Sequence, residues 1–159
     1  MSKIDLFKFV NFQPATSDSP SQIFINAGEQ KKEKDYTPVM THIITILTQS
    51  LLASQQKGFS DFDVHLNFPA DVNKKNLDTR FMFHLSKTLL QMFPNTLRFW
   101  YVYNPPRFFK IIWTTLKPMC DKELKKKVKI IKGQENYGID EYSENTQTDE
   151  SDNFSTEDL

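Results

Sequence analysis

The feature of the sequence that most constrains the fold is the run Leu97–Tyr103 (LRFWYVY), in which every residue except Arg98 is apolar or aromatic. A short run of this kind is typical of a central β-strand that is buried on both faces. Asn104-Pro105-Pro106 follows it directly. Because proline has no backbone N–H, these prolines cannot continue a hydrogen-bonded ladder. The sequence therefore predicts that the strand ends here and that a helix begins at the carboxyl edge of a sheet.

Strand and helix patterns alternate along the rest of the chain. In Phe62–Phe68 apolar residues alternate strictly with polar ones such as His65, which predicts a strand covered on one side and parallel to Leu97–Tyr103. Helical spacing predicts a helix over Thr37–Lys57, with Thr37 as its N-cap and Pro38 at its first position. The same patterns predict further strands at Gln22–Asn26 and Val128–Ile131 and further helices at Leu77–Phe93, Arg107–Lys117 and Asp121–Lys127, the last with Asp121 as its cap.

The order of these elements decides the fold class. Strands and helices alternate, and each connection between strands is long enough to cross over the sheet and return in parallel. Gln13–Ser21, which is rich in proline and serine, is predicted to be a loop before the first strand. We therefore expect an α/β fold with a mostly parallel β-sheet and crossover helices.

The formal net charge of zero hides an uneven distribution. All 20 basic residues precede residue 134, together with 11 of the 20 acidic residues. The last 26 residues hold the other 9 acidic residues and no basic one. A polar, acidic segment of this kind has too little apolar surface to offset the entropy lost on ordering. We expect one domain over residues 1–133 and a disordered acidic tail over residues 134–159.

Several classes of chemistry find no support in the sequence. The four glycines form no phosphate-binding loop, and His42, His65 and His84 show no metal-ligand spacing. The single cysteine, Cys120, precedes Asp121, which would raise the thiol pKa rather than activate it. No apolar run is long enough to span a membrane, and the N-terminus does not have the pattern of a secretory signal. We expect a cytoplasmic protein that is not an enzyme and needs no metal or cofactor.

The stretch from Phe93 to Gly133 carries a more specific pattern. An aromatic–proline pair (Phe93-Pro94) ends a helix, and a buried strand ends in Tyr101–Pro106 (YVYNPP). An aromatic-rich helix then closes with Lys-Pro and a nearby Asp (Lys117–Asp121), before the basic and apolar Lys127–Ile131. This pattern resembles the CRAL-TRIO lipid-binding domain of phosphatidylinositol transfer proteins and of retinaldehyde- and tocopherol-binding proteins. The resemblance implies a minimal CRAL-TRIO-like module that is incomplete at its C-terminal side.

The aromatic helix and the strand before it supply candidate lipid contacts. Two interpretations of these side chains stay open: they pack in the core, or one edge of the helix lines an apolar cavity that suits an acyl chain. Both can hold for different residues. The candidate cavity residues are Trp100, Val102, Phe108, Phe109, Ile112 and Trp113.

Lysines are concentrated between the aromatic helix and the end of the last predicted strand. They form either a solvated surface or a patch that contacts anionic headgroups and the membrane surface. Nucleic acid is the least favoured partner, because few aromatic residues stand among the lysines and an acidic tail follows them. The residues of this predicted patch are Lys122, Lys125, Lys126, Lys127, Lys129 and Lys132.

Two functions compete at this point. The first is binding of a hydrophobic ligand, above all a phospholipid or phosphoinositide, with peripheral contact to an anionic membrane. The second is a non-enzymatic protein-interaction adaptor derived from a CRAL-TRIO domain. Because the last predicted strand lies at a sheet edge, a protein partner or a homodimer is also expected.

Overall fold

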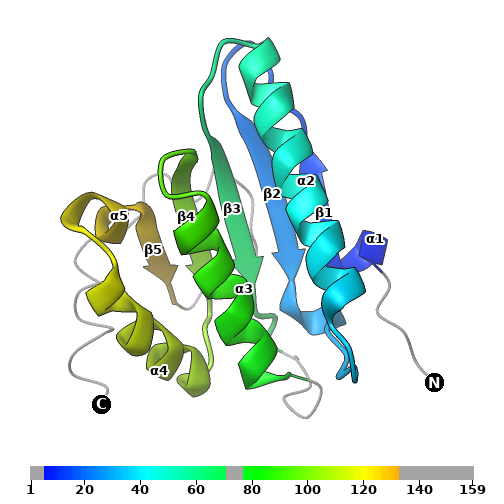
Figure 1. Ribbon diagram of the computed structural model, residues 1–159, viewed down its shortest axis with the longest axis vertical. Helices are drawn as coiled ribbons and strands as arrows, with labels where there is room; N and C mark the ends of the chain where they lie inside the picture. Colours follow the sequence, from blue (N-terminus) through cyan, green and yellow to red (C-terminus); the bar gives the residue numbers. More distant parts are fainter. Residues whose placement is uncertain (1–5, 71–76, 133–159) are drawn as a thin grey trace.

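The computed structural model describes residues 6–70 and 77–132. The predicted acidic tail, residues 134–159, lies outside the described residues. Helices and strands alternate along most of the described chain (Figure 1). The elements are α1 (Leu6–Phe9), β1 (Val10–Gln13), β2 (Ser21–Asn26), η1 (Ala27–Glu29), α2 (Thr37–Gln56), β3 (Phe62–Asn67), α3 (Thr79–Met92), β4 (Leu97–Tyr103), α4 (Arg107–Leu116), η3 (Lys117–Met119), α5 (Lys122–Lys127) and β5 (Val128–Ile131).

The described strands form one sheet in the order β1-β2-β3-β4-β5. Strands β2 to β5 are parallel, and Val64 on β3 is in register with Trp100 on β4. This confirms the predicted α/β fold with a mostly parallel sheet. Strand β1 pairs antiparallel to β2, with Val10 opposite Ile25. Neither the four-residue α1 nor the four-residue β1 was predicted.

The helix boundaries follow from local signals that the sequence contains. Asp78 and Asp121 cap α3 and α5 by accepting hydrogen bonds from backbone N–H groups in the first turns. The predicted cap at Thr37 is wrong: α2 already includes Thr37, and Tyr36 stands at the N-cap without a side-chain hydrogen bond. After β4, Asn104 adopts a positive φ of 53°, and the two prolines lead directly into α4, as predicted.

Helices α2, α3 and α4 lie on one face of the sheet (Figure 1). Sequential parallel strands joined by crossovers of one hand place their helices on the same side. The main core therefore lies between this face and the helices, around the fully buried Val64, Trp100, Val102, Phe109 and Trp113. Among the described residues, no helix is both long enough and apolar enough to cross a membrane.

On the opposite face of the sheet, the burial of β4 and the burial of β3 both differ from the predictions. The prediction that β4 is buried on both faces is wrong for Phe99 and Tyr101, which are only half-buried. On β3 the prediction was the reverse, a polar face left uncovered, yet Asp63 and His65 are each only 2 % exposed. The helices α2, α3 and α4 all lie on the other side of the sheet, so none of these three covers this face (Figure 1). Its polar residues are instead buried among neighbouring side chains of the same face.

Candidate functional site

Most of the predicted cavity residues are packed in the core. Trp100 and Val102 point from β4 towards the helices, and Phe109 and Trp113 point from α4 towards the sheet. All four are at most 1 % exposed, and the rings of Trp100 and Phe109 meet edge to face with centroids 5.9 Å apart. For these four side chains the structure supports the core interpretation.

The other two predicted residues, Phe108 and Ile112, lie at a groove between α3 and α4. Its volume is about 570 Å³, within the range of roughly 300–1,000 Å³ that ligand pockets have. Ile111, which the sequence analysis did not select, also lines it and is 56 % exposed. The full lining is Thr79, Arg80, Phe83, His84, Phe108, Ile111, Ile112 and Thr115.

The groove exists because each helix has a second, weaker apolar edge. On α4, Phe109 and Ile112 belong to the buried stripe, whereas Phe108 and Ile111 lie beside it. On α3, Phe83 is half-buried at the corresponding edge. The helices contact each other, and their outer edges leave a mostly apolar channel open to solvent. The available sequence signal was that Phe108 and Ile111 are apolar although they lie beside the stripe that contains Phe109 and Ile112.

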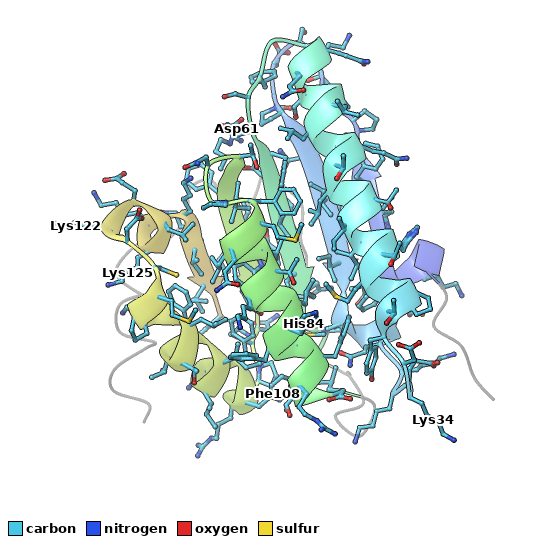
Figure 2. All side chains as sticks on the ribbon, viewed as in Figure 1. Lys34, Asp61, His84, Phe108, Lys122 and Lys125 are labelled. Atoms are coloured by element: carbon cyan, nitrogen blue, oxygen red, sulfur yellow. The ribbon has the colours of Figure 1, made fainter. Side chains whose placement is uncertain are left out.

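A second pocket, whose lining includes several charged residues, lies on the other side of α3 (Figure 2). Its volume is about 330 Å³, and the rings of Tyr36 and Phe81 stack there with centroids 4.4 Å apart. The backbone N–H of Glu33 donates to the Tyr36 hydroxyl at 3.0 Å. Burial, followed by the nearby carboxylate of Asp78, raises the pKa of Tyr36, so its hydroxyl stays protonated. The pocket is lined by Glu33, Lys34, Tyr36, Asp78, Arg80, Phe81 and His84.

The predicted lysine patch does not form a single surface. Lys122 and Lys126 are exposed on α5, and Figure 2 shows Lys122 and Lys125 beyond the C-terminal end of α4, far from Phe108 in its first turn. Lys127, in contrast, donates to the carbonyl of Pro94 at 2.7 Å. Lys129 is buried, with its ammonium 5.4 Å from the ring centre of Phe99. Lys132, the sixth member, is exposed just after β5. The lysines are close together in the sequence, but those on α5 and the one on β5 therefore lie in different surroundings.

The helix-free face of the sheet holds a chain of buried hydrogen bonds. Arg98 pairs with both carboxylate oxygens of Asp63, at 2.9 and 2.6 Å. The amide nitrogen of Gln22 donates to Asp63 at 2.8 Å, so its oxygen is free to accept from His65 Nε2 at 2.6 Å. His65 Nδ1 then accepts from the hydroxyl of Tyr103 at 2.8 Å. In this assignment the imidazole is neutral, with its proton on Nε2.

The titratable groups of this face match that pattern. Burial lowers the pKa of His65 to about 4, while Asp63 opposes this shift and Arg98 adds to it. His65 is therefore neutral near pH 7, with both ring nitrogens hydrogen-bonded.

The other groups considered in the sequence analysis show no activated nucleophile or metal site. The pKa of the Cys120 thiol is raised mainly by burial, and Asp121, which was the cause expected from the sequence, raises it less. Among the described residues no group of His, Cys, Asp and Glu could hold a metal ion.

The sequence was compared with models of known protein families, and one of them matches the region that contains most of these strands and helices. Residues 14–151 match the model of the CRAL/TRIO domain. The match covers β2 to β5 with their helices and extends into the acidic segment after residue 133. No curated protein matches the chain. Because the family model covers most of its length, the chain belongs to the CRAL/TRIO domain family, whose members bind small lipophilic molecules.

Proposed function

We propose that this protein binds a phospholipid and holds one of its acyl chains in the groove between α3 and α4. The observation that carries the proposal is the apolar groove itself, in which Ile111 is 56 % exposed beside Phe83 and Phe108. Exposed apolar side chains that line a concave surface are typical of ligand-binding sites. Each methylene of a bound chain contributes about 0.8 kcal/mol when it leaves water, so about ten methylenes are worth roughly 8 kcal/mol before the entropic cost of binding.

Binding of this kind needs no covalent step, and we propose a carrier or presenter of lipid rather than an enzyme. The surface of the groove is mostly apolar, although Arg80, His84 and two threonines also line it, and this composition suits shielding more than bond cleavage. We place this activity in the cytoplasm. Contact with an anionic membrane surface would come from the exposed lysines Lys122 and Lys126 on α5, each worth on the order of 1 kcal/mol near such a surface.

Native mass spectrometry of the purified full chain, after incubation with phospholipid vesicles, tests the proposal. We expect a stoichiometric mass increase equal to one phospholipid, and a lipid that is recovered chemically unchanged. Ile111→Asp should abolish the adduct, because it places a charge in the groove. Leu52→Asp is the matched control, since Leu52 is equally exposed, at 55 %, but lies on α2 away from the groove.

The protein-interaction adaptor makes the opposite prediction. An adaptor would keep its apo mass in the presence of lipid, and Ile111→Asp would change nothing in that experiment. A clean apo mass for the full chain would therefore refute the lipid proposal. The apolar groove is the observation that favours lipid over the adaptor.

A further inference from the structure

The face of the sheet opposite α2, α3 and α4 carries a row of aromatic side chains. The ring of His65 is stacked between those of Phe24 and Tyr101, with centroids 4.8 and 4.9 Å away. Phe99 lies next to Tyr101, with ring centroids 5.9 Å apart. Phe24, Phe99 and Tyr101 are only half-buried. Partly open aromatic surface of this kind is typical of an interaction site.

The C-terminal end of this face is more buried than those three helices can explain. Tyr103 is 0 % exposed and Ile131 is 3 % exposed. They form a hydrophobic cluster separate from the main core, and the half-buried Tyr101 packs against them. Helices α2, α3 and α4 cannot bury this cluster, because they lie on the other side of the sheet (Figure 1). The cover therefore comes from another part of the molecule.

Lys129, next to this cluster, is a cation without an acidic partner. It lies on β5 beside Tyr101 of β4, its side chain is only 9 % exposed, and its ammonium faces the ring of Phe99. In the described part of the chain no carboxylate pairs with this ammonium, whereas Arg98 is paired with both oxygens of Asp63. Burial of an unpaired charge is unfavourable. The position thus favours an occupant that brings a carboxylate as well as apolar side chains.

The chain continues from this place with a segment of that composition. Strand β5 ends at Ile131, and residues 134–142 (QENYGIDEY) contain Tyr137 and Ile139 together with three acidic residues and no basic one. The six residues from Ile131 to Tyr137 can span about 20 Å when extended. Strands β5 and β3 are two strand spacings apart, which is about 10 Å. The family match also runs to residue 151, so this segment lies within the matched domain.

We propose that residues 134–142 bind across the helix-free face of the sheet in the same molecule. Tyr137 and Ile139 lie against Tyr101. One carboxylate of the segment pairs with Lys129. A segment with so few apolar residues cannot fold alone, but it can order against a surface that is already formed. The inference does not rest on the proposed function, because the α3–α4 groove and this face lie on opposite sides of the sheet.

Thiol labelling of the full chain tests whether the segment is held on the sheet. Ile139→Cys and the control Phe154→Cys are each made together with Cys120→Ser, so that each protein has one thiol. The labelling rate in native buffer is divided by the rate of the same variant in concentrated urea, which removes the effect of neighbouring acidic residues. We expect this ratio to be at least about tenfold lower at position 139 than at position 154, because a contact with the sheet hides the thiol.

The ion pair with Lys129 is tested in the same assay. Adding Lys129→Met to Ile139→Cys keeps an apolar side chain but removes the charge, and should raise the native labelling rate at position 139 about fivefold, the size of one partly exposed ion pair. Lys126→Met, on the exposed surface of α5, is the matched control and should leave that rate unchanged.

Three results would overturn the inference. Equal ratios at positions 139 and 154 would show that the segment is not held against the domain. Slow labelling at position 139 that Lys129→Met leaves unchanged would place the segment away from this face. Slow labelling that is lost on dilution of the protein would assign the segment to the sheet of a second copy. A near-ultraviolet circular dichroism spectrum identical to that of the parent confirms that each variant is folded.

Discussion

Replacement of His65 by Gln should change how the stability of the protein depends on pH. His65 lies at the centre of the buried hydrogen-bond chain, with Gln22 on one side and Tyr103 on the other. A glutamine keeps one donor and one acceptor at this position but cannot titrate. The variant therefore separates the hydrogen bonds of His65 from its ionisation.

The magnitude follows from the pKa of His65, which burial lowers from 6.5 to about 4. Between these values the unfolded chain binds a proton that the native state does not, so stability is fully present above about pH 6.5 and falls as the pH drops towards about 4. At 1.36 kcal/mol per pKa unit, this group alone costs about 3 kcal/mol over that interval. At pH 7 the variant should be less stable than the parent by about 1 kcal/mol, because its hydrogen bonds are less well placed.

Urea denaturation followed by the fluorescence of the buried Trp100 and Trp113 measures both effects. The free energy of unfolding of the parent should fall by about 3 kcal/mol more than that of His65→Gln between pH 7 and pH 4. The two curves should therefore cross, and the variant should be the more stable protein at pH 4. The exposed His84 provides the control, since His84→Gln should follow the parent. Parallel curves for the parent and His65→Gln would refute the assignment of a buried, neutral His65.

Three further outcomes follow from the packing. Phe109→Ala should destabilise the protein by about 3–5 kcal/mol in thermal or urea denaturation, because the side chain is fully buried against Trp100; a loss below about 1 kcal/mol would contradict the core assignment. Arg98→Met should cost about 2 kcal/mol, since it leaves the carboxylate of Asp63 buried with fewer partners; equal stability of variant and parent would argue against the ion pair. Cys120 should react with a thiol reagent at least about tenfold more slowly in the native protein than in urea, because burial hides the thiol and raises its pKa; equal rates would contradict its burial.

Much of the secondary structure could be predicted from the residues alone. The apolar run at Leu97–Tyr103 and the prolines after it gave the observed bounds of β4 and the start of α4. Asp121 caps α5 as predicted, whereas α3 begins at Thr79, two residues after the predicted start at Leu77, with Asp78 as its cap. Such signals are local, since periodicity and capping act over a few residues and do not depend on the rest of the fold. The exceptions are α1 and β1, which were not predicted; β1 pairs antiparallel with β2.

The position of each side chain relative to the rest of the molecule was decided only by the tertiary structure. Phe108 and Phe109 are adjacent and chemically identical, yet one lines the groove and the other is buried under Trp100. Successive residues of a helix point about 100° apart, so Phe109 faces the sheet while Phe108 faces the groove beside α3. In the same way, Gln22 and His65 become partners only because β2 and β3 pair in parallel with a particular register. A sequence pattern shows which residues share a face of an element, but what lies opposite that face depends on contacts between residues that are distant in the chain.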